Sequence, residues 1–442
     1  MRVRFAPSPT GYLHAGNARI AVVNALAAKA GGGEMLLRLD DTDTARCRQD
    51  YADAIVQDLA WLGIGWSMQV RQIDRLALYE AAAEKLRAAG RLYPCFESEE
   101  ELAYKREQRR RMGKPPVYDR AALKMTPEQR AKAEGNGKRP YWRFLLSTET
   151  VHWDDAVLGE RRVKLPAVSD PVLVRADGSF LYTFTSVVDD IDLAITEVIR
   201  GEDHVTNTGI QTDIFRALGA TPPGFAHLPL LADAEGGKLS KRIGSLSLRG
   251  LRGDGVEPEV VVGFLAALGT GEPPVAGSVD SLAAGFDLSR YGSSAARFDP
   301  AQLLALNRRH LHGLDFAAVR GRLPPGATEA FWNAVRGNLD LLGEARGWWD
   351  VVAGTIVPPV IEGEGGFLRA ALDALPAGPW DGGVWDAWID AVKAATGRKG
   401  KALFLPLRLA LTGEEHGPEL REILPLIGPD RARMRLRVAA GV

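Results

Sequence analysis

The N-terminal part of the chain alternates between apolar runs of strand length and longer stretches of helical period. Strand patterns occur at 2–6 and 35–39, and helical patterns at 17–30, 51–62 and 76–89. The first helical stretch, rich in Ala, Leu and Val, should end at three consecutive glycines. This order, with a polar turn after the first strand, predicts a doubly wound, Rossmann-like α/β domain that binds its ligand beyond the carboxyl ends of the strands.

The pattern changes from about residue 92 to residue 182. A charged helix at 99–112 and a Pro-rich turn precede short alternating stretches at 141–146 and 161–165. The segment therefore reads as an α+β insertion between two halves of the α/β domain. The α/β pattern then resumes with a strand at 193–199 and a helix at 209–218.

The last third of the chain is dominated by helical patterns interrupted by prolines, which predicts an all-α region. We expect five segments: 1–92, the first half of the catalytic domain; 93–182, the insertion; 183–242, the second half; 243–299, a mixed, mostly helical domain; and 300–442, the all-helical region.

The composition is that of an ordinary globular protein and does little to narrow the possible functions. The 442 residues are 46% hydrophobic and 25% charged, with a formal net charge of −1. A nucleic-acid partner would therefore have to contact local basic patches. The two cysteines, Cys47 and Cys95, give no disulfide framework. Without an N-terminal targeting stretch or a run of 18 apolar residues, the chain is predicted to be cytoplasmic and not to bind membranes.

Two short segments carry the candidate chemistry. The first runs from Pro7 to Asn17 and places His14 at the start of the first helix; the second is Lys238-Leu239-Ser240-Lys241-Arg242. A helix N-terminus offers backbone N–H groups and a positive dipole end to an anion. His14, Lys238 and Lys241 can neutralise the charge that builds when a nucleotide is attacked at its α-phosphorus. The two segments together predict a nucleotide site and adenylation chemistry.

These segments resemble the His-x-Gly-x and Lys-x-Ser-Lys signatures of class I aminoacyl-tRNA synthetases. Three further stretches resemble the glutamyl-tRNA synthetase family in sequence and order: Arg4 to Gly11, Arg38 to Asp43, and Val188-Asp189-Asp190 leading to Val198 to His204. The resemblance runs from residue 2 to about residue 437. A lone Lys-x-Ser-Lys would be weak evidence, whereas four ordered motifs at plausible separations are specific.

The resemblance implies ATP-dependent ligation of L-glutamate to tRNA through glutamyl-adenylate. His14, Lys238 and Lys241 would be catalytic. ATP would contact Pro7, Thr10, Gly11, His14, Gly16, Asn17, Lys238, Leu239, Ser240 and Lys241. Glutamate would contact Arg4, Ala6, Ser8, Asp40, Tyr182, Ser186 and Arg200. The two arginines would take the side-chain carboxylate and Asp40 the α-ammonium group.

Further expectations come from the same resemblance. ATP would act with Mg²⁺, the partner would be a glutamate-accepting tRNA or also tRNA(Gln), and the chain would be a monomer. The insertion would hold the tRNA acceptor end, segment 243–299 would contact the stem, and 300–442 would bind the anticodon. No protein metal site is expected, zinc included, because Cys95 is followed by Phe96 and Glu97 and no second Cys or nearby His completes four ligands.

The chain departs from the family pattern at three positions. Asn17 stands where a second His is often quoted, Asp40 where many relatives have Glu, and Ser186 where relatives often have Asn or Cys. The shorter side chain of Asp40 reaches less far toward an ammonium group. These departures leave the three roles open while the motifs themselves are intact.

Each candidate also has a structural interpretation. His14 could be a surface histidine, and Lys238 and Lys241 could merely solubilise a loop. Arg4 and Arg200 could pair with a protein carboxylate such as Asp40 or Asp43. The basic residues of helix 99–112 could be solvent-exposed or contact a tRNA backbone, arginines 431, 433, 435 and 437 read as a solvated helix, and tryptophans 348 and 349 as core.

The same sequence bears on several rival functions. The related glutaminyl enzyme has a longer, β-barrel C-terminal half. The helical pattern of residues 300–442 disfavours this enzyme. The same region disfavours a truncated relative that modifies tRNA. A catalytically silent tRNA-binding paralogue conflicts with intact His14, Lys238 and Lys241. An enzyme that also charges tRNA(Gln), for example a second-copy synthetase, stays open.

Overall fold

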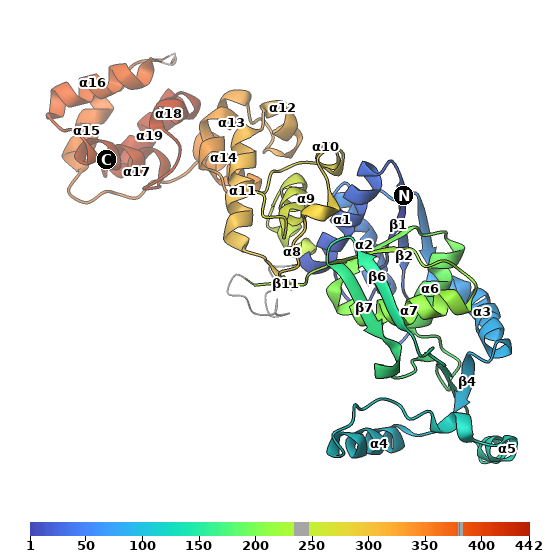
Figure 1. The fold of residues 1–442 in the computed structure, drawn as a ribbon. Coiled ribbons are helices and arrows are strands. Elements are labelled where there is room, and N and C mark those ends of the chain that lie inside the picture. Colours follow the sequence, from blue (N-terminus) through green and yellow to red (C-terminus); the bar gives the residue numbers. More distant parts are fainter. Residues whose placement is uncertain (234–246, 379, 381–382) are drawn as a thin grey trace. The chain divides into compact units, whose positions relative to one another are not determined.

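The computed structural model describes residues 1–233, 247–378, 380 and 383–442, and they form two compact units (Figure 1). The first unit comprises 1–252 and 258–299, and the second 253–257 and 300–442. Lys238, Leu239, Ser240 and Lys241 lie outside the described residues.

The first unit is built on parallel strands with helical crossovers. Its strands are β1 Arg2–Phe5, β2 Glu34–Leu39, β3 Met68–Arg71, β4 Leu92–Cys95, β5 Tyr141–Phe144, β6 Thr150–Asp155, β7 Gly159–Lys164, β8 Val172–Val174, β9 Glu197–Gly201, β10 Gly224–Leu228, β11 Leu231–Ala232 and β12 Ala296–Arg297. Its helices are α1 Ala15–Ala30, α2 Gln49–Trp61, α3 Leu76–Ala88, α4 Glu99–Arg111, α5 Pro127–Gly135, α6 Tyr182–Asp192, α7 Val205–Ala217, α8 Leu248–Gly253 (its last residue assigned to the second unit), α9 Pro258–Ala267 and α10 Val279–Ala283.

The sheet order brings both halves of the α/β domain together. Strands β1, β2 and β3 are parallel neighbours, and β9 pairs in parallel with β10. The backbone N–H of Thr196, just before β9, donates to the carbonyl of Arg2 in β1 at 2.9 Å. The carboxyl ends of β1, β2 and β9 therefore lie at one edge, as expected for a doubly wound fold.

The insertion contributes two antiparallel arrangements. Strand β5 lies between β4 and β8, and β6 pairs with β7 as a hairpin. The end of β6 also adjoins β10 through Asp155 and Phe225, so the hairpin is fastened to the α/β sheet. Helix α4 begins at a capping box on Ser98 and has no buried residue.

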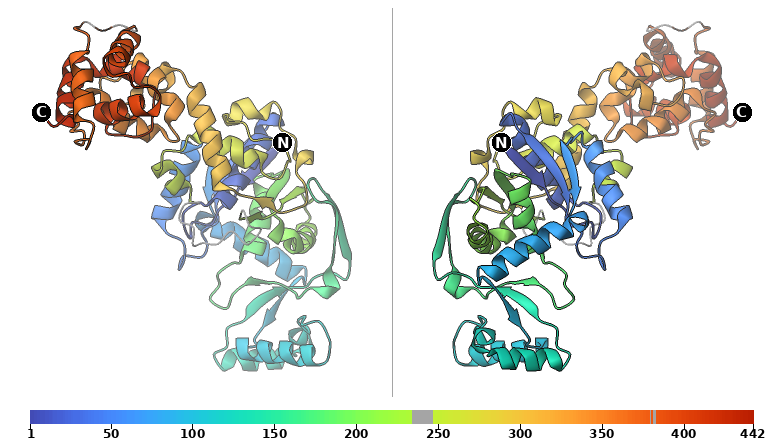
Figure 2. Two further views of the ribbon diagram at one scale, coloured as in Figure 1. Left: turned by 90° about the vertical axis from the view of Figure 1, so that its left-hand side faces the viewer. Right: turned by 90° about the vertical axis from the view of Figure 1, so that its right-hand side faces the viewer.

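The second unit is helical throughout its described residues from 300 onward (Figure 2). Its helices are α11 Pro300–Gly313, α12 Phe316–Val319, α13 Glu329–Val335, α14 Ala345–Ala353, α15 Gly365–Asp373, α16 Val384–Thr396, α17 Lys401–Thr412, α18 Leu420–Ile427 and α19 Pro429–Ala439. They share one apolar core in which Trp332 and Trp388 are fully buried. The doubly wound and all-helical fold classes predicted from the sequence are confirmed.

Two expectations are wrong in detail. The strand expected at 193–199 starts only at Glu197, because Leu193 caps α6 and Ala194 turns the chain with a φ of 51°. Arg435 is not solvated: its guanidinium is buried and donates to the carbonyls of Leu411 and Gly354. The interpretation of Trp348 and Trp349 as core residues agrees with their packing against the helical core.

Candidate active site

His14 forms the N-cap of α1. Its Nδ1 accepts hydrogen bonds from the backbone N–H groups of Gly16 at 3.1 Å and Asn17 at 3.4 Å. The imidazole therefore occupies the helix terminus that the sequence assigns to an anion. His14 and Asn17 are exposed and Gly16 is half-buried, so a ligand can reach them from solvent.

The chain that follows the Lys-x-Ser-Lys segment returns to this same place. Ser247 forms an antiparallel bridge with His14, and the backbone N–H of Leu248 donates to the carbonyl of Leu13 at 3.1 Å. Arg249 adds a hydrogen bond of 3.0 Å to the hydroxyl of Tyr12. The two motifs predicted to act together are thus joined through described residues, although Lys238 and Lys241 themselves are not described.

The loops after β1 and β2 meet beside the helix terminus. The backbone N–H of Asp40 donates to the carbonyl of Pro7 at 3.0 Å. Ala6 is half-buried, whereas Ser8 and Thr10 are exposed and Gly11 is half-buried. The predicted ATP and glutamate residues of this loop therefore line the carboxyl edge of the sheet, with solvent-accessible side chains at Ser8 and Thr10.

A buried ionic network lies behind this edge, and it engages two of the predicted glutamate contacts. Arg4 Nε donates to Asp190 Oδ1 at 3.1 Å, and Arg38 bridges the same oxygen and Asp40 Oδ1, each at 2.7 Å. Burial raises the pKa of Asp40 to about 6, although Arg38 opposes the shift. Arg4 thus has a protein carboxylate as partner, but Asp190 rather than the anticipated Asp40 or Asp43.

Asp189 extends this network toward the neighbouring helices. Its carboxylate accepts from Gln72 Nε2 and Arg75 Nε, each at 2.7 Å, and from the hydroxyl of Tyr79 at 3.0 Å. Arg38 Nε lies 3.6 Å from Asp189 Oδ2. The structure thus assigns a role to Arg38, Asp189 and Asp190 that sequence reasoning missed. The signal was present, because consecutive acids in an otherwise apolar helix stretch require buried partners.

Arg200 differs from Arg4 in its partners. Its side chain is buried, and its three donating nitrogens contact neutral groups: Nε contacts His227 Nε2 at 3.3 Å, Nη1 the hydroxyl of Tyr182 at 3.2 Å, and Nη2 Thr208 Oγ1 at 2.7 Å. None of the ion pairs among the described residues includes Arg200. Asp190, whose charge acts on Arg200, is already bonded to Arg4 and Arg38.

Among the described residues, this arrangement leaves the positive charge of Arg200 without an ion-pair partner. Burial lowers the pKa of Arg200, which is the direction expected for a desolvated cation. A buried guanidinium presents a fork of donors that matches a carboxylate. Arg200 with Tyr182 is therefore suited to receive an anionic side chain from a ligand.

Ser186 is buried and its hydroxyl accepts from Gln211 Nε2 at 2.6 Å. His204 lies beside Tyr182, with ring centroids 5.3 Å apart. Burial and the charge of Arg200 lower the pKa of His204 to about 4, so the imidazole is neutral near pH 7. A neutral His204 adds no competing cation to the anion site.

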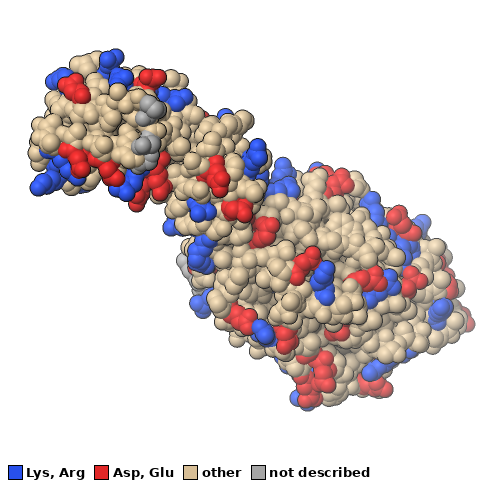
Figure 3. Space-filling model, turned by 90° about the horizontal axis from the view of Figure 1, so that it is seen from above, with Lys and Arg blue, Asp and Glu red and all other residues tan. Residues whose placement is uncertain are grey.

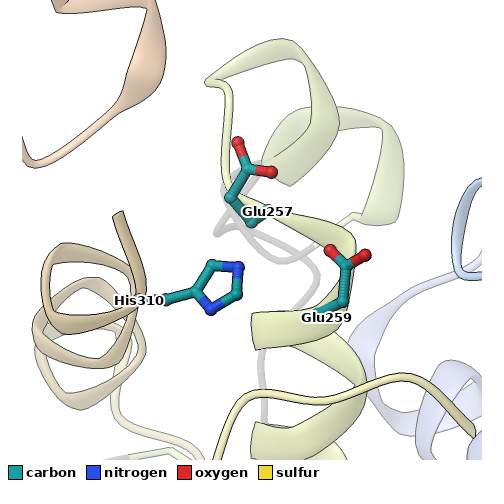
Figure 4. A group of neighbouring side chains, drawn as sticks. All are labelled: Glu257, Glu259 and His310. Atoms are coloured by element: carbon teal, nitrogen blue, oxygen red, sulfur yellow. The ribbon is translucent and has the colours of Figure 1, made fainter. Parts of the chain in front are cut away.

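The described residues contain little that could hold a metal ion. Cys95 is buried with its sulfur 3.7 Å from the hydroxyl of Tyr118, and burial raises the pKa of its thiol to about 12. Neither cysteine belongs to a group of ligand atoms close enough to share an ion, within the part of the chain that is described. In the second unit, both carboxylate oxygens of Glu257 accept hydrogen bonds from Arg322 Nη1, at 2.9 and 2.8 Å. Figure 4 shows the side chains of Glu257, of His310 and of Glu259 in α9.

The surface charge is mixed. Basic and acidic side chains lie interspersed on the face drawn in Figure 3. Helix α4 ends in Arg109, Arg110 and Arg111, whose side chains are exposed or half-buried. No helix among the described residues has the length and apolar character needed to cross a membrane.

Known protein families match most of the chain. Residues 1–281 match the model of the catalytic domain of class I tRNA synthetases (E and Q), and residues 364–440 match an anticodon binding domain. The chain is 63% identical to glutamate--tRNA ligase 2 of Granulibacter bethesdensis over 442 residues, covering 100% of this chain and 99% of the relative. It is 60% identical to glutamate--tRNA ligase 2 of Gluconacetobacter diazotrophicus, with both chains fully covered.

Solved structures agree with these relatives. A glutamate tRNA ligase from Elizabethkingia meningosepticum, solved in complex with its amino acid, superposes with a TM-score of 0.88 at 25% identity, covering 100% of this chain and 99% of that one. A glutamate-tRNA synthetase from Elizabethkingia anophelis gives a TM-score of 0.86 at 25% identity, with full coverage of both chains.

Proposed function

The chain belongs to the glutamate--tRNA ligases of the class I tRNA synthetases, and we propose that it activates L-glutamate with ATP and transfers it to tRNA through a glutamyl-adenylate. The observation that carries the choice of amino acid is Arg200, a buried cation whose protein partners among the described residues are neutral. A glutamate side chain supplies the missing charge, whereas glutamine leaves it unpaired.

The reaction needs no nucleophile from the protein. The α-carboxylate of glutamate attacks the α-phosphorus of ATP and pyrophosphate leaves, so the protein contributes positioning and charge neutralisation. His14, together with Gly16 and Asn17 at the start of α1, receives the phosphates. Lys238 and Lys241 stabilise the leaving pyrophosphate; this is supported by the bridge from Ser247 to His14, which places the described chain that follows them at the helix terminus.

Glutamate recognition uses the carboxyl edge of the sheet. Arg200 and Tyr182 take the side-chain carboxylate, while Ala6 and Ser8 line the pocket with Arg4 and Asp40 behind them. Because Arg38 already engages Asp40, the ammonium group of glutamate shares this carboxylate with Arg38. Ser186 contacts glutamate from the buried side of this site, where a hydrogen bond from Gln211 holds its hydroxyl in place.

Magnesium enters this scheme with ATP. Among the described residues, Asp40 is bonded to Arg38 and Asp41 to Arg71 at 2.7 Å, so these carboxylates fit an ion carried by phosphate oxygens rather than one held in a protein cage. When bound, the ion neutralises phosphate charge. No zinc is expected, and the enzyme is proposed to act as a monomer in the cytoplasm.

The RNA partner is proposed to be a glutamate-accepting tRNA. The insertion would hold its acceptor end, and the helical second unit, which includes the anticodon binding domain, would read the other end. Charging of tRNA(Gln) with glutamate is the second candidate for the same active site.

The test is aminoacylation of purified tRNA(Glu) and tRNA(Gln) with glutamate and with glutamine, alongside glutamate-dependent exchange of pyrophosphate into ATP. We expect exchange to require tRNA and glutamate to be strongly preferred. Lys241→Ala should lower kcat by roughly 10² to 10³ with little change in the KM for ATP, as for a contact strongest in the transition state. Binding of tRNA without exchange or aminoacylation would contradict the proposal and indicate a tRNA-binding paralogue.

A further inference from the structure

Behind Arg200 lies a hydrogen-bonded pair that the proposed reaction does not use. His227 of β10 is fully buried, its Nδ1 bonds to Asp155 Oδ2 and its Nε2 faces Arg200 Nε at 3.3 Å. Asp155 ends β6, a strand of the insertion, so the pair links the hairpin to the arginine that the proposed function assigns to glutamate. Neither side chain is among the residues that the proposed function assigns to the substrate, and His227 contacts Arg200, which is.

The chemistry of the two neighbours fixes the tautomer of His227. An arginine Nε can only donate, so His227 Nε2 must be the accepting nitrogen. An ionised carboxylate can only accept, so His227 Nδ1 must carry the proton. Both conditions are met by the same neutral form of the ring.

The ionisation of both groups fits this geometry. Burial lowers the pKa of His227, and the charges of Arg200 and Arg4 lower it further, so the ring stays neutral although Asp155 opposes the shift. Burial alone would raise the pKa of Asp155, but hydrogen bonds from His227 and from backbone N–H groups hold it below its usual range. The titratable neighbours also include His204, neutral near pH 7, and Glu197, whose pKa is raised by burial and by the charge of Asp155.

The Asp155 carboxylate is itself held rigidly. Its Oδ1 accepts from three backbone N–H groups: those of His227 at 3.0 Å, Val157 at 3.2 Å and Leu158 at 3.0 Å. Its Oδ2 is left to face the imidazole, with Trp153 Nε1 at 3.3 Å. The orientation of the carboxylate, and through it of the ring, is therefore set by the backbone of β10 and of the turn that follows β6.

We propose that Asp155 is a positioning residue for glutamate selectivity: by accepting the Nδ1 proton of His227, it keeps Nε2 as the acceptor that aims the Arg200 guanidinium at the substrate carboxylate. Thr208 completes the alignment, because its hydroxyl accepts from Arg200 Nη2 at 2.7 Å and lies 2.9 Å from His227 Nε2. This inference rests on the proposed contact between Arg200 and glutamate.

The sharpest test is Asp155→Asn. The three backbone donors hold an acceptor at the Oδ1 position, so the carbonyl oxygen of asparagine must lie there and its NH₂ group must face His227 Nδ1. The ring proton is then forced to Nε2, against the N–H of Arg200. A comparable inversion of tautomer by an Asp-to-Asn change is known to impair a histidine that must accept a proton.

We expect Asp155→Asn to lower kcat/KM for glutamate roughly 10- to 100-fold, the scale of one hydrogen bond to a charged group. The loss should appear mainly in the KM for glutamate and should reduce the preference over glutamine, with the KM for ATP unchanged. Nitrogen-15 NMR of the histidines should show the His227 proton on Nδ1 in the parent protein and on Nε2 in the variant. This NMR measurement does not depend on the enzymatic activity of the protein.

His227→Gln serves as the matched rescue, because its amide oxygen can accept from Arg200 without any tautomer, whereas His227→Leu removes the acceptor. The glutamine variant should retain most of the glutamate preference and the leucine variant should lose it. Adding Asp155→Asn to His227→Leu should cost no further preference for glutamate, because the leucine background already lacks the acceptor through which Asp155 acts.

An equal loss of glutamate preference from Asp155→Asn in the parent protein and in the His227→Leu background would overturn the positioning role. Equal kinetics for the His227→Gln and His227→Leu variants would overturn it as well. If Asp155→Asn does not fold, the His227 pair alone decides. A failure of the underlying function looks different: Arg200→Met would then keep its full preference for glutamate, while the NMR spectrum of the parent protein would still show the Nδ1 proton.

Discussion

Replacing Arg200 by methionine should separate substrate recognition from stability. Methionine has a similar length and fills the space without polar atoms, so the packing around Phe225, whose ring lies 5.8 Å from the guanidinium carbon, is largely kept. What is lost is the positive charge that the proposed pocket offers to the side chain of glutamate.

The magnitude follows from the hydrogen bonds removed. A guanidinium and a carboxylate form two charge-assisted bonds, each worth about 1.5–3 kcal/mol. Their loss corresponds to roughly 10² to 10⁴ in kcat/KM for glutamate at about 1.4 kcal/mol per decade. Glutamine should lose much less, because its neutral amide never compensated the charge.

The free energy of unfolding of Arg200→Met, in contrast to its activity with glutamate, should not fall. In the free protein Arg200 carries the desolvation cost of a buried cation without a carboxylate partner among the described residues, so an apolar replacement should leave the free energy of unfolding unchanged or higher. Arg4→Met is the matched control, since Arg4 is equally buried but bonded to Asp190. Its loss should destabilise the protein by about 1–3 kcal/mol.

The assay measures kcat/KM for glutamate and glutamine at saturating ATP and tRNA, together with urea unfolding, on both variants. An unchanged preference for glutamate in Arg200→Met would refute the substrate-binding role. A fall in stability equal to that of Arg4→Met would show that Arg200 serves the fold instead.

Three other predictions follow from the same network and its surroundings. Asp189→Asn should lower the free energy of unfolding by about 3–5 kcal/mol in urea titration, because Arg75 and Arg38 lose a buried charge partner; a loss below about 1 kcal/mol would contradict this. The stability of the parent protein relative to that of His204→Asn should fall as pH drops from about 6.5 toward 4, because unfolded histidine takes up protons that folded His204, with a pKa of about 4, does not; thermal melts of both proteins at several pH values measure this difference. Elemental analysis of the purified protein should find no stoichiometric zinc, because buried Cys95 has no second cysteine or histidine beside it in the described structure; one zinc per chain would overturn this.

The local elements were predictable because their patterns are local. The apolar run of β1, the glycines that end α1 and the turn that presents His14 are each set by residues only a few positions apart. The strand at 193–199 was misplaced because an apolar stretch of that length does not reveal where a helix cap ends and a strand begins. Arg435 was misjudged because only the packing of α19 against the other helices shows which arginine points inward.

The sequence yields candidate residues for the site but not the partners that these residues have within the protein. The sequence places Arg4 and Arg200 on strands that end at the same edge, and both are buried as a ligand pocket requires. It does not tell which of the two meets a protein carboxylate, because Asp190 approaches Arg4 from a helix 186 residues away. The relay from Asp155 through His227 is hidden for the same reason, since its members come from separate strands.

Arg200 has no ion-pair partner within the part of the chain that the structure describes, and this has a practical consequence for work with the enzyme. A desolvated guanidinium with neutral neighbours attracts whatever small anion the solution provides, so chloride or sulfate will compete with glutamate for this position. Affinities measured in different salts are then not comparable, even at equal ionic strength. A buffer whose anion is too bulky to reach buried Arg200 is then the proper reference state for measurements of glutamate binding.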